Sequence, residues 1–354
     1  MLSNIWCAVM SKICQINIIA PNIKNGGGRE LLEYLLIYLE EMYKNIDVVV
    51  YVDSSLSNMK PTNNRVIVKL SSTIDKIKLF CKKMENGIYF GNLPPLVKSF
   101  NSIVYFHNPY LIMDIKSLYR QSIYFFLKYG LQQIYINFFL KNVNSVACQN
   151  MRIKKAFIKK YNYTNVDILP FYRSCPQVKK PLKKIYDLCY VSLAHPHKNH
   201  KLLFDSLEIL GRKGLSISIA VTIEDSKKDL ISQLNYINDL YEIRIINLGV
   251  VPKKDVCKLY QKTKCLVFPS TRETFGLGLV EAVEMGLDVI AADLSYTHEI
   301  ISTPFLFNPK SSLSCAIVIE RYLNTTSPPK STKLIENKID VLINKITRSA
   351  NVSR

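Results

Sequence analysis

The stretch from residue 264 to 293, KCLVFPSTRETFGLGLVEAVEMGLDVIAAD, constrains the fold of this chain more than any other. It opens on a short apolar run, 265–268, that is typical of a buried parallel strand. A polar turn carrying Glu273 follows, and the apolar spacing over 276–285 then predicts a helix. Residues 288–292 predict the next strand. The sequence therefore predicts a β-α-β unit in which Glu273 lies in the loop at the carboxyl end of a strand.

The start of the predicted helix favours an anion site, because open α/β sheets bind ligands outside the carboxyl ends of their strands. Phe275, Gly276 and Leu277 offer backbone N–H groups at a helix N-terminus, whose partial positive charge suits a phosphate. Gly276 and Gly278 are expected to let a ligand approach the backbone closely. The pattern thus predicts a phosphate-binding turn.

Two carboxylates flank this turn: Glu273 before it, and Glu281 about two turns into the helix. They can accept hydrogen bonds from hydroxyls on either side of a diphosphate, as a sugar, a diphosphate and a ribose in a row would require. The segment FPSTRETFGLGLVEAVEMGLDVIA resembles the E-x7-E signature of retaining glycosyltransferases with the GT-B fold, and is most similar to family 4, the group-1 glycosyl transferases. It departs from the family at Gly278 and Asp288, where proline is usual.

This resemblance implies an α/β protein of the GT-B fold, with two Rossmann-like domains that face each other across a cleft. It implies a donor nucleotide-diphosphate sugar held mostly by the second domain, and transfer with retention, without a metal or other cofactor. Glu273 would bind hydroxyls of the donor sugar and Glu281 the ribose. Val250, in the loop 249–251, would lie against the nucleobase.

The sequence KNH after the first strand of the second domain resembles the family's phosphate-binding lysine, here Lys198. A lysine beside free N–H groups suits a departing diphosphate. The family usually has an arginine a few residues earlier, where this chain has His195 and His197. Either a histidine or Arg272 supplies the second positive group, or none does.

In the first domain, Gly26, Gly27 and Gly28 follow a predicted strand, 13–20, and precede a predicted helix, 29–43. They resemble the family loop that lines the cleft near the acceptor or the donor diphosphate; alternatively, they only permit a tight turn. His107 follows another predicted strand, at the edge where ligands bind. The family commonly has a histidine here that contacts the donor sugar near the reacting bond, although a lone histidine is often structural.

The chain has 354 residues, enough for two α/β domains. The expected boundaries are 1–172 for the acceptor-side domain, 173–186 for a linker rich in proline and basic residues, 187–330 for the nucleotide-sugar-binding domain and 331–354 for a tail helix. Nine cysteines show no CxxC and no paired spacing. We therefore expect free thiols in a reducing, cytoplasmic compartment.

A formal net charge of +19 suits anionic partners. No membrane-spanning run or signal-peptide layout is evident. The aromatic, basic segment 117–143 predicts either a helix at a membrane interface or a core helix.

From the family resemblance we expect a peripheral enzyme on the inner face of the cell membrane, with a polyprenyl-linked saccharide acceptor from surface polysaccharide synthesis (O-antigen or capsule) and no nucleic acid. The alternatives are a nucleotide-sugar epimerase of the GT-B type, and a non-enzymatic basic protein that binds anionic membrane or nucleic acid.

Overall fold

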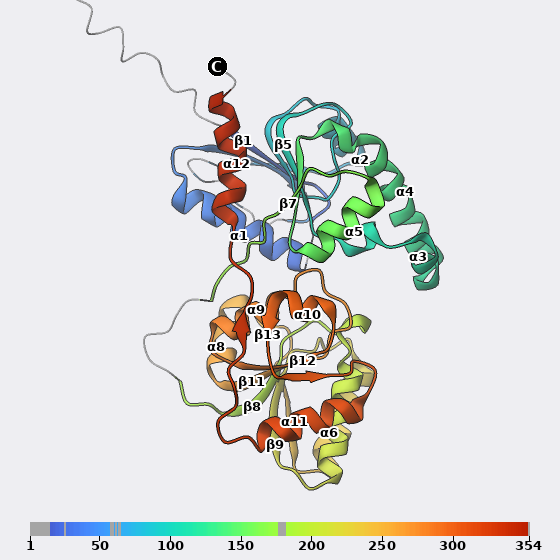
Figure 1. Ribbon diagram of the computed structural model, residues 1–354, viewed down its shortest axis with the longest axis vertical. Coiled ribbons are helices and arrows are strands. Elements are labelled where there is room, and N and C mark those ends of the chain that lie inside the picture. The colour runs from blue at the N-terminus through green and yellow to red at the C-terminus, as the bar shows by residue number, and fades with distance from the viewer. Residues whose placement is uncertain are drawn as a thin grey trace, which may run out of the picture. The chain divides into compact units, whose positions relative to one another are not determined.

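The computed structural model describes residues 15–24, 26–56, 60, 62, 65–175 and 182–352. The chain divides into two compact units (Figure 1). Unit 1 comprises residues 1–173 and 336–354, and unit 2 comprises residues 174–335. Each unit is an α/β layer structure built on a parallel sheet, which confirms the predicted fold class of two Rossmann-like domains.

Unit 1 is a seven-stranded parallel sheet in the order β3-β2-β1-β4-β5-β6-β7. Its order reverses between β1 and β4, which creates a topological switch point. The first helix packs on the sheet through a stripe of five buried leucines. The strands are β1 (Gln15–Ala20), β2 (Asp47–Asp53), β3 (Arg65–Leu70), β4 (Glu85–Tyr89), β5 (Phe100–Phe106), β6 (Ser145–Cys148) and β7 (Val166–Ile168), and the helices are α1 (Gly26–Met42), α2 (Thr73–Phe80), α3 (Ile115–Gln121), α4 (Ile123–Phe139), α5 (Met151–Tyr161) and α12 (Ile339–Val352).

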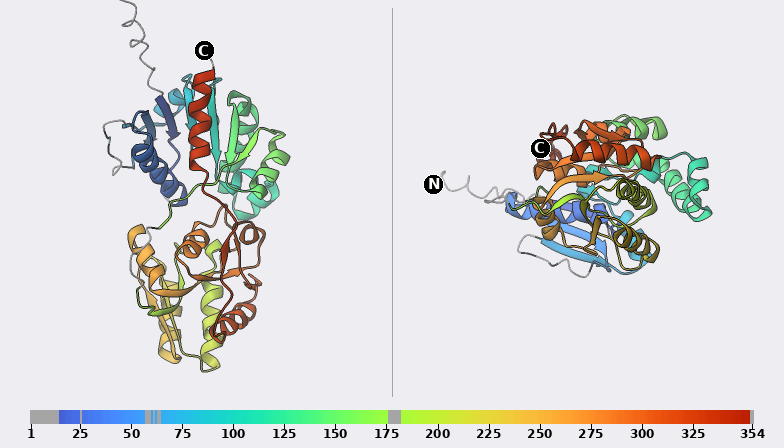
Figure 2. Two further views of the ribbon diagram at one scale, coloured as in Figure 1. Left: turned by 60° about the vertical axis from the view of Figure 1, so that its left-hand side comes forward. Right: turned by 90° about the horizontal axis from the view of Figure 1, so that it is seen from below.

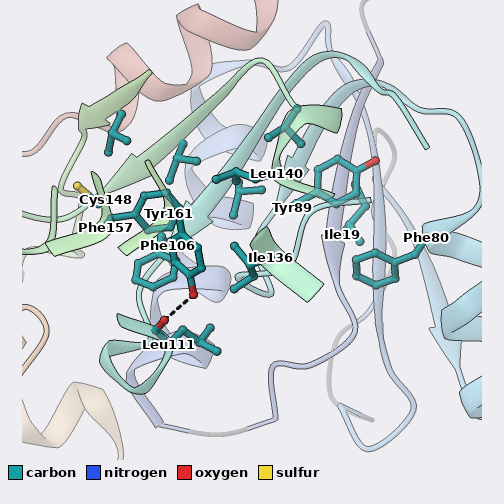
Figure 3. Packing of buried hydrophobic residues seen from close by; sticks show 14 of the residues in the cluster. Ile19, Phe80, Tyr89, Phe106, Leu111, Ile136, Leu140, Cys148, Phe157 and Tyr161 are labelled. Carbon is teal, nitrogen blue, oxygen red and sulfur yellow. Dashed lines mark hydrogen bonds between the residues drawn. The ribbon is translucent and has the colours of Figure 1, made fainter. Parts of the chain in front are cut away.

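Aromatic and aliphatic side chains fill the space between this sheet and α4 and α5 (Figure 3). Phe106, the last residue of β5, meets Phe157 edge to face, with ring centroids 4.9 Å apart. The buried hydroxyl of Tyr161 donates to the carbonyl of Leu111, 2.5 Å away, and so ties α5 to the turn that follows β5 (Figure 3). This packing fixes the carboxyl end of β5, from which His107 emerges.

Unit 2 is a six-stranded parallel sheet in the order β10-β9-β8-β11-β12-β14, with its switch point between β8 and β11. Unit 2 also has a separate two-stranded antiparallel sheet, in which β13 pairs with β15. The strands are β8 (Tyr186–Tyr190), β9 (Ile217–Val221), β10 (Ile243–Asn247), β11 (Thr263–Phe268), β12 (Asp288–Ala292), β13 (Ile301–Ser302), β14 (Phe305–Phe307) and β15 (Thr332–Lys333), and the helices are α6 (His200–Arg212), α7 (Lys228–Leu240), α8 (Lys253–Gln261), α9 (Leu277–Glu284), α10 (Ser295–Ile300) and α11 (Ser312–Leu323).

The tail differs from the single polar helix expected there. Residues 332–333 form strand β15, and the helix α12 begins only at Ile339. Its buried residues Ile339, Leu342, Ile343 and Ile346 pack in unit 1, where α12 lies beside β4 and β5 (Figure 2). The tail is thus an integral layer of the first unit, because its apolar stripe needs a sheet face to cover it.

Two further expectations need correction. The segment 117–143 is two helices, α3 and α4, because Ser122 leaves helical geometry and caps α4 by accepting from the N–H of Phe125. The expectation of unpaired cysteines is wrong at one pair, since Cys175 and Cys257 form a disulfide between the start of unit 2 and α8. The partners lie 82 residues apart, a spacing that no short cysteine motif reveals. Among the described residues, no helix is long and apolar enough to cross a membrane.

Candidate functional site

The loop between β11 and α9 holds the glutamate of a first lysine–glutamate pair. Glu273 lies in this loop, and its Oε1 is 2.5 Å from Nζ of Lys198. Lys198 ends a short 3-10 turn (Pro196–Lys198) between β8 and α6. Because β8 and β11 are neighbours across the switch point, their loops meet at the carboxyl edge of the sheet. Both side chains are mostly buried, with 19% and 14% of their surface exposed.

Backbone hydrogen bonds hold these two loops together. The carbonyl of His197 accepts from the N–H of Thr271 at 2.8 Å and from its hydroxyl at 3.1 Å. The hydroxyl of Ser270 also donates to this carbonyl, at 3.2 Å. The buried hydroxyl of Tyr190 donates to the carbonyl of Lys198 at 2.7 Å. The Lys198–Glu273 pair is therefore presented by a fixed backbone.

Helix α9 begins at Leu277, and its N-terminus lies in this same loop. Gly276, the N-cap, has a φ of +68°, which favours glycine, and as a glycine it has no side chain of its own to cap the helix. A Cβ at Gly276 would also lie 3.2 Å from Leu279 Cδ1. The first N–H groups of a helix lack carbonyl partners within the helix, so the phosphate-binding turn stays a prediction for this position. Phe275 itself is buried.

Gly278 has a different role from the one expected. A Cβ at this position would lie 3.2 Å from the ring of Phe268 and 3.6 Å from the hydroxyl of Tyr260. The glycine therefore faces the protein and lets α9 approach β11, rather than letting a ligand approach the backbone. Proline, which is usual in the related family, would bring its ring toward the same aromatic side chains.

The second pair joins Glu281 on α9 to Lys253, the first residue of α8. The Glu281 residue is only 5% exposed, and the Lys253 ammonium binds its Oε1. Lys253 was not among the predicted site residues. Its position gave a usable signal, because it lies two residues after the loop expected to hold the nucleobase, 249–251. A buried carboxylate at this edge requires such a partner.

Three residues are candidates for the positive group that replaces the family arginine: His195, His197 and Arg272. His195 and His197 stack with ring centroids 5.8 Å apart. Burial, with the positive charge of Lys198 and neighbouring groups, lowers the pKa of His197 below its ordinary value. His197 is therefore mainly neutral at pH 7. Arg272, half-buried in the same loop as Glu273, remains the permanently charged candidate.

Val250 lies in the loop between β10 and α8, and 65% of its surface is exposed. Gly249 before it has a φ of +64°. The side chain of Asn247 accepts from the Gly249 N–H at 3.1 Å, which fixes the turn. An exposed valine on a fixed turn can contact a flat apolar ring.

The carboxyl edge of the unit 1 sheet holds His107. Asn92 Oδ1 accepts from the backbone N–H groups of His107 and Asn108, at 2.7 and 3.0 Å. The Asn92 amide nitrogen then faces His107 Nε2, 3.4 Å away, as a donor. Phe90 lies beside the imidazole, with ring centroids 5.2 Å apart. Burial lowers the pKa of His107 to about 4, so this side chain is neutral at pH 7.

The glycine-rich segment meets His107 at the same edge. Helix α1 begins at Gly26, so the three glycines form its first turn rather than a loop before it. A Cβ at Gly28 would lie 3.1 Å from His107 Nε2 and 3.3 Å from Ile23 Cδ1. Gly26 has a φ of +67° and open space around it. Gly28 therefore leaves room for the His107 imidazole, and a part for this glycine in ligand binding stays a prediction.

Comparisons with known proteins bear on the family and the fold. Residues 176–341 match the family model of the glycosyl transferases group 1. The O-antigen chain mannosyltransferase RfbU of Salmonella typhimurium is 26% identical over 247 residues, which span 64% of this chain and 64% of that relative.

Among solved structures, sucrose-phosphate synthase of Thermosynechococcus elongatus superposes with a TM-score of 0.67 at 13% identity, covering 96% of this chain and 98% of that one. An Anabaena protein crystallised with UDP and glucose superposes with a TM-score of 0.62 at 13% identity, covering 95% and 98%. The chain therefore has the GT-B fold, and residues 176–341 match the group 1 glycosyl transferases.

Proposed function

We propose that this protein is a retaining glycosyltransferase that moves a sugar from a nucleotide-diphosphate sugar to a saccharide acceptor. The observation that carries the proposal is the pairing of Lys198 with Glu273 beside the N-terminus of α9, where the N-cap is a glycine. A cation, a set of backbone donors and a carboxylate lie together at a topological switch point, where a sugar diphosphate needs all three.

In this proposal Lys198 and the amides of α9 stabilise the charge that grows on the departing diphosphate, which is the main catalytic contribution. Lys198 has three donors, so it can keep Glu273 in place while it binds a phosphate oxygen. Glu273 accepts hydrogen bonds from hydroxyls of the transferred sugar, and Arg272 adds the second positive charge. The reaction needs no metal, because the lysine and the helix supply the electrostatic stabilisation.

The second lysine–glutamate pair and Val250 bind the nucleoside end of the donor. Glu281 accepts from the ribose hydroxyls, and Lys253 keeps this buried carboxylate charged. Val250 packs against the base. His107, neutral and held by Asn92, binds the transferred sugar near its reacting carbon through a hydrogen bond that carries no net charge.

The acceptor is proposed from the relatives. The matched Salmonella protein is named an O-antigen chain mannosyltransferase, which favours a mannosyl donor and a growing surface polysaccharide as the acceptor. Such chains grow on a polyprenyl-linked carrier, so the protein would work as a peripheral enzyme on the inner face of the cell membrane.

The surface of α4 supports this membrane placement. Six apolar residues of the helix are more than half exposed: Ile123, Tyr124, Leu127, Leu131, Ile134 and Phe138. At about 100° per residue they fall within an arc of about 100°. The opposite face, with Gln133 and Ile136, is buried. Residues 115–142 contain four basic residues and no acidic one. An apolar stripe with basic neighbours suits the boundary of an anionic bilayer.

The donor site can be tested by calorimetric titration of the full chain with UDP, GDP and ADP, using Glu281→Gln and Glu284→Gln. Both glutamates lie on α9 and each pairs with a lysine, Lys253 for Glu281 and Lys333 for Glu284. We expect one nucleotide to bind and the Glu281 variant to bind it about tenfold more weakly, while the Glu284 variant is unchanged.

Other outcomes discriminate between the alternatives. If no nucleotide binds, the glycosyltransferase proposal fails and a non-enzymatic basic protein gains support. If a nucleotide sugar is converted to free nucleotide and a sugar without any acceptor, the epimerase alternative is favoured. Transfer of the sugar to a lipid-linked saccharide, with the anomeric configuration followed by NMR, tests retention.

Vesicle sedimentation tests the membrane surface separately. Leu127→Ser with Leu131→Ser is expected to lower retention on vesicles that contain anionic lipid. Ile74→Ser with Ile77→Ser, at two exposed positions on α2, is the matched control and should have no effect. Equal loss in both variants would contradict docking through α4.

A further inference from the structure

The amino-terminal edge of the unit 2 sheet carries a second group of charged residues. Lys184 precedes β8, Lys264 is the second residue of β11, and Asp288 begins β12. With Lys330 and the end of α11, they line a pocket of about 430 Å³. Strands rise about 3.3 Å per residue, so the span from Lys264 to the end of β11 is about 13 Å. The pocket therefore lies at the opposite end of the strand from the proposed donor site.

One buried carboxylate anchors this pocket. The side chain of Asp288 is 4% exposed, and both of its oxygens lie 3.1 Å from Nζ of Lys330. The hydroxyl of Tyr322 donates to Asp288 at 3.2 Å. A buried carboxylate with these partners fixes the position of the Lys330 ammonium. Asp288 is also one of the two positions where this sequence departs from the family pattern.

The other two lysines are placed by the backbone and by an aspartate. Lys184 donates to the carbonyls of Thr263 at 2.7 Å and Tyr260 at 3.4 Å, which are neutral acceptors. Lys264 donates to Asp187 at 2.8 Å. Since an ammonium has three N–H groups, each lysine keeps at least one donor beyond these bonds.

The pocket has an excess of positive charge. Three lysines and one aspartate line it, which gives three positive charges against one negative. Counting Asp187 as well still leaves one positive charge unbalanced. Burial lowers the pKa of Lys184, and the charge of Lys330 adds to this effect. An anion in the pocket would relieve the repulsion between the ammonium groups. Thr325 and Thr326 add hydroxyls to the lining.

We propose that this pocket binds a small phosphate-bearing molecule, a phosphomonoester, through Lys184, Lys264 and Lys330. Several point-charge donors around one space match the tetrahedral oxygens of a phosphate better than a planar carboxylate. The volume accommodates a phosphate with a small alcohol such as glycerol. The site is separate from the donor site and adds a second ligand to unit 2.

Calorimetric titration with inorganic phosphate and with glycerol 3-phosphate tests the proposal on the full chain. The titrations use a Lys198→Met background, so that phosphate binding at the donor site is removed. Lys264→Met should weaken binding about tenfold. Lys262→Met, an exposed lysine two residues earlier that does not line the pocket, should leave it unchanged.

Two outcomes would overturn the site: no saturable binding in the Lys198→Met chain, or equal binding in the Lys264 and Lys262 variants. Lys184→Met provides a second, independent variant, and retained nucleotide binding on the Lys198 wild-type background shows that the variants are folded. Vesicles with and without phosphatidic acid identify the source of the phosphate. Vesicle capture that falls in Lys264→Met assigns it to a lipid, and loss of soluble binding alone assigns it to a free ester.

Discussion

The carboxyl edges of the two sheets are built on the same topology but differ in charge. In unit 2 the loops at the switch point carry the Lys198–Glu273 pair, and helices α8 and α9 beside them carry the Lys253–Glu281 pair. In unit 1 the loops after β4 and β5, which form the neutral part of the corresponding edge, carry a neutral histidine, an asparagine and an aromatic wall, whereas Asp53 at the end of β2 pairs with Lys76. The difference shows that the fold supplies the location of a site while the loops decide its chemistry. Under the proposed function, the charged edge manages the diphosphate and the neutral edge contacts the sugar.

The largest effect is expected at the charged edge. Lys198→Met removes the cation that faces the departing diphosphate and, with it, the ammonium that pairs with Glu273. We expect transfer to slow by about 10²–10³, as when one preorganised donor is removed from an anion site. Lys201→Met is the control, because that lysine is 75% exposed and pairs with Asp205 on α6. A sugar-transfer assay on both variants measures this difference. Equal rates would show that Lys198 does not take part in catalysis.

The buried histidines predict how stability depends on pH. Burial lowers the folded-state pKa of His107 and His200 to about 4, from an ordinary value of 6.5. The unfolded chain therefore takes up protons first, so the free energy of unfolding is highest above pH 6.5 and falls as pH drops toward 4. The loss is about 3 kcal/mol for His200, which is 3% exposed, and less for the half-buried His107.

Urea unfolding at several pH values, followed by circular dichroism, measures this loss. His107→Gln should flatten the curve between pH 4 and 6.5, and His200→Gln should flatten it more. Curves that are parallel in all three proteins would show that neither histidine is neutral by burial. Activity from pH 6 to 8 should not change through His107, since it stays neutral throughout.

A smaller effect is expected where the glycine segment meets the neutral edge. Gly28→Ala would bring a Cβ to 3.1 Å from His107 Nε2, so the imidazole must shift by a few tenths of an ångström. We expect transfer to slow about tenfold, with stability nearly unchanged, because alanine also favours the helix by about 0.5–1 kcal/mol. Gly130→Ala in α4 meets nothing within 4 Å and serves as the control, which should gain stability without losing activity. Equal activity in both variants would contradict the contact.

The sequence predicted much of unit 2 because its motif is local. One strand, one turn and one helix place Glu273, Gly276 and Glu281, and the structure brings Lys198 to the same turn. Contacts between residues far apart in the sequence could not be predicted. The Lys253–Glu281 pair spans 28 residues and the disulfide spans 82, and no periodicity encodes either.

Gly276 and Gly278 show the same difference between local and long-range determinants. Gly276 could be predicted, because its left-handed φ belongs to a local turn. Gly278 could not, because the ring of Phe268 that it accommodates comes from a neighbouring strand. The roles of the site residues in binding and catalysis stay predictions until the variants are measured.

The smallest effect is expected at Val250, where a substitution distinguishes binding of the base from binding of the phosphates. Val250→Ser removes methyl groups from an exposed side chain, which if packed against a base contribute about 1 kcal/mol, or about fivefold in affinity. Nucleoside diphosphate binding should weaken by this factor, whereas pyrophosphate binding should not change, because pyrophosphate has no base. Val66→Ser, at a similarly exposed valine of β3 in unit 1, should alter neither. If pyrophosphate and nucleotide weaken together, Val250 acts by shaping the loop, and the base must bind elsewhere along this edge.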